Sequence, residues 1–182
     1  MGLFDWWRRK PDAIPPMGRY LPVTEDRDEQ YDVLPAALRP WAEDQLRLQA
    51  AHYASRPGPY PLPAIPGGGI RALAIPIEAA IAALSAVLDR FDGVLPPGNV
   101  PSTGPAAFGP SPLTAVILGH DRDGLLADIE LILHGNRRDE EMALLRGLAT
   151  LPARDGLIVV DWLEGRIAQL DDAADLDAFL PV

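Results

Sequence analysis

The order of apolar and polar positions is most regular in the last seventy residues of the chain. Residues 113–120 (LTAVILGH) and 125–135 (LLADIELILHG) each have the length and composition of a strand. The DRDG turn between them favours a hairpin, because an Asp-Gly pair suits positive φ. Alternate positions of the second strand are apolar, which puts Asp128 and Glu130 together on the opposite face. This alternation predicts an antiparallel sheet with one face open to water.

A helix and a second hairpin follow in the sequence. Leucines at helical spacing after Asn136 predict a helix that Asn136 caps, with acidic residues in its first turn. Residues 156–160 (GLIVV) are apolar on both faces and predict a central strand, which turns back at Glu164 into another strand. Asp171 or Asp172 then caps a short final helix, whose apolar residues we expect to pack inward.

The N-terminal half contains two predicted helices and two segments dominated by proline and glycine. Residues 34–55 are rich in good helix formers and have Pro40 in the first turn. The apolar residues of this helix that fall near one face are Leu38, Ala42, Leu46 and Tyr53. Residues 77–91 carry apolar side chains at helical spacing. Residues 56–69 and 92–112 are so rich in proline and glycine that they predict irregular loops.

These elements together predict a fold class and a domain organisation. Residues 11–34 are polar and broken by proline, so we expect an irregular N-terminal segment over residues 1–34, followed by a single domain over residues 35–182. Residues 70–76 (IRALAIP) predict a short strand. The expected fold class is α+β, with an antiparallel sheet of about four to five strands covered on one face by helices. The C-terminal order is β-β-α-β-β-α, and two helices precede it.

Charge and composition narrow the classes of function. The chain has 26 acidic and 16 basic residues, a formal net charge of −10. This balance disfavours nucleic-acid binding, because neutralising phosphates needs a basic surface. The absence of cysteine excludes disulfides and thiolate metal sites. No apolar run is long enough for a membrane span, and the start MGLFDWWRRK lacks the apolar core of a secretory signal, so we expect the cytoplasm.

The stretch PGGGIRALAIP resembles the oxyanion loop of patatin-like phospholipases, which runs Gly-Gly-Gly-x-Arg-Gly. Gly67, Gly68, Gly69 and Arg71 match that pattern. The resemblance implies backbone N–H groups that stabilise a developing oxyanion. Ala72 stands where the last glycine belongs, and the chain contains no G-x-S-x-G nucleophile motif. A flexible loop leading into a strand is the alternative interpretation.

Four residues are candidates for catalysis or partner binding. Asp161 ends the central strand, where a carboxylate is often catalytic in α/β folds. An aspartate at a hairpin end also commonly accepts hydrogen bonds from local backbone N–H groups. Trp162 is expected to be half exposed beside it, where it would anchor a partner. Asp128 and Glu130 would serve glycoside hydrolysis, partner binding or only a solvated face. The spacing of the three histidines predicts no shared metal site.

The C-terminal segment GLIVVDWLEGRIAQLDDAADLDAFL resembles that of several bacterial immunity proteins of polymorphic toxin systems. In such proteins an apolar strand ends in an Asp-Trp-like pair, a tight hairpin follows, and a short helix opened by acidic residues closes the chain. The resemblance implies a small, acidic, cytoplasmic protein that binds a cognate toxin and blocks it.

Our first hypothesis is therefore a non-catalytic binding protein, an immunity or inhibitor protein with an acidic surface. We expect a protein partner, a basic toxin domain, and no metal or cofactor. The expected partner-binding residues lie on the open sheet face and in the C-terminal segment: Asp128, Glu130, Asp161, Trp162, Glu164, Asp171 and Asp172.

Two other classes of function stay open at this point. A small hydrolase would have its site near Asp161, with His120 or Ser102 as possible further members. A structural or adaptor component of a secretion or phage-like assembly would dock its proline- and glycine-rich loops on its neighbours. In that case the segment around Trp6 and Trp7 would act as a tether. The sequence does not predict the oligomeric state.

Overall fold

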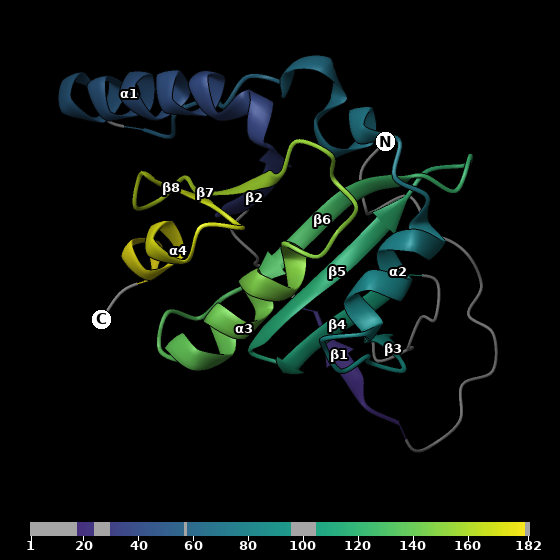
Figure 1. Cartoon of the computed structure of the whole chain (residues 1–182). Helices are drawn as coiled ribbons and strands as arrows, with labels where there is room; N and C mark the ends of the chain where they lie inside the picture. Colours follow the sequence, from purple (N-terminus) through teal and green to yellow (C-terminus); the bar gives the residue numbers. More distant parts are fainter. Residues whose placement is uncertain (1–17, 24–29, 57, 96–104, 181–182) are drawn as a thin grey trace.

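The computed structural model describes residues 18–23, 30–56, 58–95 and 105–180, which form a mixed α+β fold (Figure 1). In chain order, its elements are β1 (Tyr20–Pro22), β2 (Tyr31–Pro35), the 3-10 helix η2 (Ala36–Leu38), α1 (Arg39–Ser55), the 3-10 helix η3 (Pro66–Leu73), α2 (Ile77–Ser85), β3 (Gly93–Leu95), β4 (Ala106–Ser111), β5 (Thr114–His120), β6 (Leu126–Ile132), α3 (Arg138–Leu148), β7 (Leu157–Asp161), β8 (Arg166–Gln169) and α4 (Ala173–Phe179). Within the described ranges, every helix is too short or too polar to span a bilayer.

In the described ranges the strands form three small sheets instead of one. β4, β5 and β6 form an antiparallel sheet in that order, and β2, β7 and β8 form a second. β1 pairs with β3 in parallel. The expected single sheet of four to five strands is therefore wrong. The reason is that the C-terminal hairpin pairs with β2, where Val33 stands opposite Val159, and not with the β5–β6 hairpin.

Four strands lie in segments that we expected to be irregular. β1 and most of β2 lie within residues 1–34, and β3 and β4 lie within residues 92–112. The first three pair with segments far away in the sequence, so no adjacent turn or partner marks them. Proline is tolerated in them because Pro22 and Pro35 stand at the ends of their strands.

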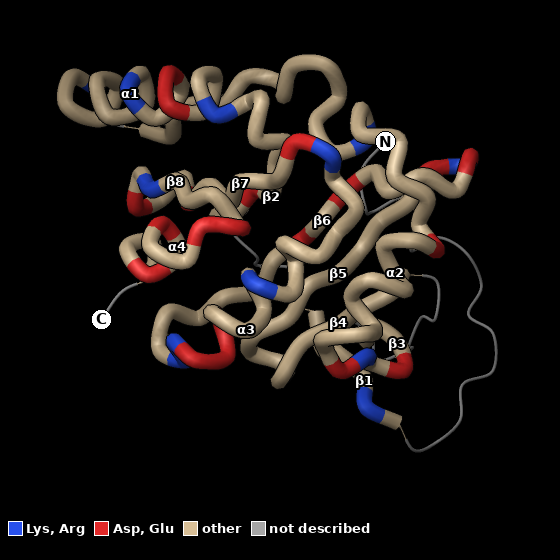
Figure 2. The backbone as a smooth tube through the Cα atoms, viewed as in Figure 1, with Lys and Arg blue, Asp and Glu red and all other residues tan. Residues whose placement is uncertain are grey.

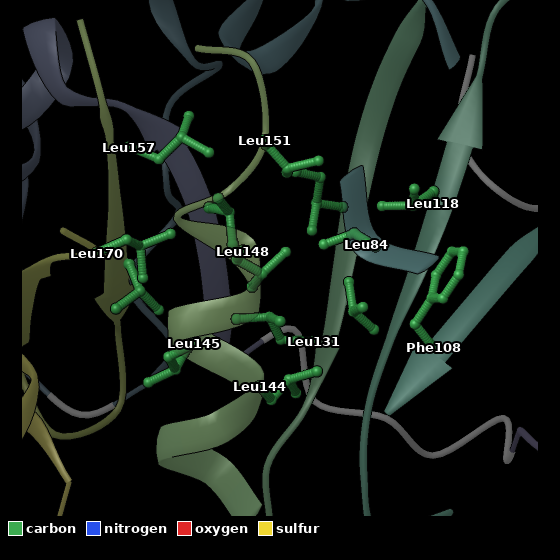
Figure 3. Close-up of a cluster of buried hydrophobic side chains, with 14 of the residues drawn as sticks. Leu84, Phe108, Leu118, Leu131, Leu144, Leu145, Leu148, Leu151, Leu157 and Leu170 are labelled. Atoms are coloured by element: carbon green, nitrogen blue, oxygen red, sulfur yellow. The ribbon is translucent and has the colours of Figure 1, made fainter. Parts of the chain in front are cut away.

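The main hydrophobic core lies between the β4–β5–β6 sheet and helices α2 and α3 (Figure 3). Leu144, Leu145 and Leu148 line the inner side of α3 and are fully buried, as their spacing predicted. The same cluster includes Leu157 of β7 and Leu170 after β8. Helix α3 therefore packs against both larger sheets and joins them into one body.

The outer faces of both larger sheets are also covered. Ile117 and Ile132, on the far face of the β4–β5–β6 sheet, pack in one cluster with residues of β1 and β3. The face that we expected to be open to water is therefore closed over part of its length. On the second sheet, Ile158 and Val160 pack against α1. β7 is thus buried on both faces and lies between two strands, which confirms its predicted central position.

Helix α3 begins differently from the prediction. It starts at Arg138, and Asn136 is not its cap. Instead, the backbone N–H of Gly135 donates a 2.7 Å hydrogen bond to Oε1 of Glu141, a carboxylate in the first turn. Glu141 is buried, and this bond ties the segment before α3 to the first turn of the helix, while no side chain of the described residues caps the N–H groups of that turn.

Two other boundaries also differ from the prediction. Helix α2 ends at Ser85, earlier than the apolar spacing up to residue 91 predicted. Residues 70–76 do not form a strand, because most of them belong to η3 and to the turn that leaves it. The predicted cap of α4 is confirmed, since Asp172 accepts hydrogen bonds from the backbone N–H groups of the first turn.

Candidate functional site

The C-terminal hairpin joins β7 to β8 and is built around the side chain of Asp161. Asp161 ends β7 opposite Arg166 of β8 and is buried. Its Oδ1 atom accepts hydrogen bonds from the backbone N–H groups of Leu163 and Glu164, both at 3.0 Å, and from Nε2 of Gln30 at 3.1 Å. These bonds confirm the expectation that a hairpin-end aspartate binds local backbone N–H groups.

Trp162 does not have the half-exposed position that we expected. Its side chain is only 4% exposed, its Nε1 donates a 2.7 Å hydrogen bond to Oδ2 of Asp32, and its ring meets that of Trp41 edge-on at 6.1 Å. The reason is the alternation along β7, which puts Trp162 on the same face as Ile158 and Val160, the face that α1 covers.

Leu163 occupies the exposed position instead. It lies in the turn of the hairpin and is 74% exposed, more than any other large apolar side chain in the described part of the chain. Leu163 was not among the predicted binding residues, because the larger ring of the neighbouring Trp162 was expected to be the anchor. The signal was nevertheless present, since Trp162 completes the buried alternation of β7 and the next side chain must lie in the turn.

Of the remaining predicted residues of this segment, Glu164 lies at the hairpin tip, whereas Asp171 and Asp172 follow β8 at the other end of the hairpin, near the start of β7. From residue 161 to residue 180 the chain has six acidic residues and a single arginine. Glu164 and Asp171 are exposed, and the Glu164 carboxylate lies 3.4 Å from Nη2 of Arg166. Asp172 is exposed while its Oδ1 accepts the 2.8 Å cap bond of α4. Figure 2 shows these acidic positions on the hairpin and α4.

Two further acidic side chains attach α4 to the rest of the molecule. Asp175 Oδ2 lies 2.7 Å from Nη2 of Arg39 in α1, and Asp177 Oδ1 lies 2.8 Å from Nη2 of Arg138 in α3. Arg166 of β8 also donates to the carbonyl oxygen of Phe179 at the end of α4. The hairpin and α4 therefore form one connected surface.

Tyr31 lies behind the hairpin, where β2 pairs with the end of β7. Burial of its ring, and after it the nearby carboxylates of Asp161 and Glu141, raises the pKa of the Tyr31 hydroxyl to about 12. The hydroxyl also accepts a 3.0 Å hydrogen bond from Nε2 of Gln30. Tyr31 is therefore a protonated, neutral group beside two buried acidic residues at all ordinary pH values.

We expect Tyr31→Phe to reduce the alkaline loss of stability. The pKa of Tyr31 is higher in the folded chain than in the unfolded chain, so the folded chain keeps this proton to higher pH. The protonated hydroxyl therefore contributes fully to the free energy of unfolding below pH 10, and this contribution is lost as pH rises toward 12. The ring is partly exposed, so the contribution is on the order of 1 kcal/mol. Urea unfolding of both proteins at about pH 9 and about pH 11.5 measures the difference. Equal losses in both proteins would contradict it.

Asp128 and Glu130 lie in the other sheet, on β6. Asp128 is exposed and lines an open pocket of about 260 Å³ between the two larger sheets, and Glu130 is half-buried. Asp32 of β2 lines the same pocket and accepts the hydrogen bond from Trp162. Asp32 thus lies between the predicted binding residues of β6 and those of the C-terminal hairpin, since it shares the pocket with Asp128 and is hydrogen-bonded to Trp162. A role for Asp128 and Glu130 in partner binding stays a prediction.

The glycine-rich stretch forms the turn η3 and not a loop that feeds a strand. Gly67, Gly68 and Gly69 all have positive φ, and the last two line the pocket beside β2. Arg71 does not line this pocket. Its Nε lies 2.7 Å from Oδ2 of Asp121 in the β5–β6 turn. Through this ion pair Arg71 attaches η3 to the β5–β6 turn.

Several other candidates can be placed from the structure. Across the described ranges, no group of three or more His, Asp or Glu side chains is placed to hold a metal ion. The His120 Nδ1 atom lies 2.9 Å from the carbonyl oxygen of the adjacent Asp121. Ser102 and the Trp6-Trp7 segment lie outside the described residues.

Comparisons with protein-family models, with curated proteins and with solved structures each found no match to this chain. The hairpin tip presents one exposed leucine next to the exposed Glu164, on a turn that hydrogen bonds to Asp161 hold in place.

Proposed function

We propose that this chain is a non-catalytic protein-binding protein whose binding surface is the C-terminal hairpin together with α4. The observation that carries the proposal is the position of Leu163. A large apolar side chain is held out in solvent at a turn that the buried Asp161 carboxylate stabilises. Exposed apolar side chains on ordered surfaces are frequent anchors of protein–protein interfaces.

The rigid presentation of Leu163 favours binding. Three hydrogen bonds to Asp161 and the buried ring of Trp162 hold the turn before any partner arrives. A preorganised turn loses less conformational entropy on association than a flexible loop does. Burying a leucine side chain in a partner's pocket contributes about 1.5–3 kcal/mol.

The charge near the tip indicates which partners fit. Glu164 lies at the tip and Asp171 and Asp172 lie at the start of α4, so carboxylates are spread over the surface of the hairpin and α4. A partner with an apolar pocket and basic side chains around it is complementary to this surface. Complementary charge acts mainly on the association rate and on the choice of partner. It also makes binding sensitive to salt, because exposed charges are screened.

In its more specific form, the proposal is that the partner is a basic toxin domain and that the chain is a cytoplasmic immunity protein. The resemblance of the C-terminal segment and the acidic charge of the chain support it. The bonding of Asp161 supports a binding protein over a hydrolase, since Oδ1 of that carboxylate already accepts three hydrogen bonds within the hairpin.

A capture experiment with charge variants tests this function. The tagged chain is mixed with lysate of the cells that produce it, and bound proteins are identified after washes at low and high salt. We expect one basic, stoichiometric partner that is lost at high salt and is not captured by the double variant Glu164→Lys, Asp171→Lys. The double variant Asp89→Lys, Asp123→Lys changes the net charge equally at exposed positions elsewhere and is expected to keep the partner.

Equal capture by both double variants would contradict the assignment of the hairpin surface. Capture of no stoichiometric partner at low salt would contradict the binding function itself. Thermal unfolding of each variant controls for loss of the fold, which we do not expect because all four side chains are exposed.

A further inference from the structure

The connection from α1 to η3 is an exposed segment rich in proline. Residues 58–66 read GPYPLPAIP, so four of these nine residues are prolines. Residues 59–65 belong to no helix or strand. Within this stretch only Tyr60 and Ile65 are partly buried, and all the other residues are exposed. Prolines and small apolar groups therefore dominate this part of the molecular surface.

The prolines restrict the backbone of this segment to one conformation. The proline ring holds φ at about −65°, and the residue before a proline is confined to extended conformations. Every residue from 59 to 65 except Ala64 either is a proline or precedes one. Ile65 has φ −62° and ψ 125°, within the usual scatter of the polyproline II helix. These restrictions favour a polyproline II helix over residues 59–65, with about three residues per turn.

Two partly buried side chains attach the segment to the rest of the molecule. The Tyr60 hydroxyl donates a 3.1 Å hydrogen bond to Oε1 of Gln45 in α1, and the Tyr60 ring meets that of His52 at 5.6 Å. Ile65 packs against the hydrophobic cluster that lies under α1. The segment is therefore held at both ends before any partner arrives, so its binding would cost little conformational entropy.

The residues between these two anchors face solvent. In a helix with about three residues per turn, Pro61 and Ala64 lie on the same edge, and the two anchoring residues lie on the other two edges. Leu62 is 40% exposed, and Pro63 beside it is exposed as well. The four residues form an uncharged apolar strip on the outer side of the segment.

The backbone of the segment offers hydrogen-bond acceptors but few donors. Prolines at positions 59, 61 and 63 have no N–H group. In the described part of the chain, no donor bonds to the carbonyl oxygens of residues 59–64. A partner that reads this backbone must therefore supply donors, and the indole N–H of tryptophan and the hydroxyl of tyrosine are suitable ones.

We propose that residues 59–65 bind a protein domain whose groove is lined by tryptophan and tyrosine rings, as the grooves of SH3 and WW domains are. Such grooves accept polyproline II segments because the conformation is already formed and the rings pack on the prolines. The same aromatic residues donate hydrogen bonds to the carbonyl oxygens. This inference goes beyond the proposed hairpin function and uses other residues, so either can fail without the other.

Stiffening of the connection is the alternative use of these prolines. A variant that keeps every proline separates the two uses. Leu62→Asp leaves the prolines and both anchors in place but puts a charge into the apolar strip. Val87→Asp is the matched control, because Val87 is a similarly exposed apolar residue on another part of the surface.

Binding of purified domains to the purified full chain tests the proposal. The probes are a set of SH3, WW and EVH1 domains, titrated into the ¹⁵N-labelled chain and followed by NMR. We expect at least one domain to bind with a dissociation constant below about 1 mM and to shift the amide signals of Leu62 and Ala64. Leu62→Asp is expected to weaken this binding at least about tenfold, whereas Val87→Asp leaves it unchanged.

A second pair of variants tests the role of the prolines. Pro61→Ala with Pro63→Ala is expected to weaken binding, because the segment loses its fixed conformation. Pro112→Ala with Pro152→Ala removes two exposed prolines elsewhere and is expected to keep it. Thermal unfolding of each variant controls for loss of the fold.

Two outcomes would overturn the proposal. One is a chain whose signals from residues 60–65 are not shifted by any of the domains at about 1 mM, which would leave stiffening as the use of the prolines. The other is binding that Leu62→Asp does not weaken, which would place the contact elsewhere on the molecule.

Discussion

Replacing Gly109 with alanine is expected to destabilise the protein by about 3–5 kcal/mol. Gly109 lies in β4 at a shift of register against β5 and has a φ of +152°, a conformation that is essentially reserved for glycine. A Cβ atom at this position would lie 2.3 Å from the carbonyl oxygen of Thr114 and 2.7 Å from Cα of Ala115. Both are backbone atoms of the paired strand, so the added methyl group must push the two strands apart.

Gly124→Ala is the matched control for this substitution. Gly124 also has positive φ, +74°, but an added Cβ atom there would meet no heavy atom within 4 Å. We therefore expect only the cost of the left-handed conformation, about 1–2 kcal/mol. Urea unfolding of the two variants separates backbone strain from the clash in β4. A loss for Gly109→Ala no larger than that for Gly124→Ala would contradict the close approach of β4 and β5.

Asp161→Ala has the second largest expected effect. The substitution removes the acceptor of three hydrogen bonds, so their donors at a partly buried turn lose their partner. We expect the free energy of unfolding to fall by about 2–3 kcal/mol. We also expect faster hydrogen exchange at the amides of Leu163 and Glu164, because their acceptor is lost. Urea unfolding and exchange measured by NMR or mass spectrometry test both parts of the prediction.

Asp161→Asn is the control, because its side-chain carbonyl can still accept from the turn. We expect it to keep most of the stability and of the amide protection that Asp161→Ala loses. An Asp161→Ala variant with wild-type stability and protection would contradict the structural role of this carboxylate. It would reopen the hypothesis of an enzyme site at Asp161.

The sequence predicted the elements whose partners are near in the chain. The β5–β6 hairpin has its Asp-Gly turn and its alternation within one short stretch, and the leucines of α3 show their buried side directly. The cap of α4 by Asp172 was likewise a local signal. In each case the physical cause lies within about ten residues of the element, where a single sequence displays it.

The missed elements depend on distant partners. β2 is a short strand whose ladder is completed by β7, so Val33 gives no local sign of its pairing with Val159. In α1 the sequence predicted an apolar inner face, yet Gln45 is buried there because the Tyr60 hydroxyl donates to it. Tyr53, which we placed on that inner face, is exposed because the far end of α1 extends beyond the sheet that it covers.

In the candidate site, too, features with a local cause were predictable from sequence and features that depend on distant segments were not. The hydrogen bonding of Asp161 follows from its position before a turn and was foreseeable from sequence. The alternation along β7 also indicated that Leu163 lies in the turn, but the burial of Trp162 depends on α1, which covers that face of β7. The link between Asp128 and the hairpin through Asp32 also depends on two sheets that the sequence did not separate.

The affinity of Leu163→Ala for the captured partner tests the central claim, that the hairpin tip is the binding anchor, most directly. The dissociation constant is measured by isothermal titration for the wild type, for Leu163→Ala and for Val87→Ala, which trims an exposed apolar residue elsewhere. We expect Leu163→Ala to weaken binding at least about tenfold, whereas Val87→Ala leaves the affinity unchanged. Equal affinities for Leu163→Ala and the wild type would contradict it.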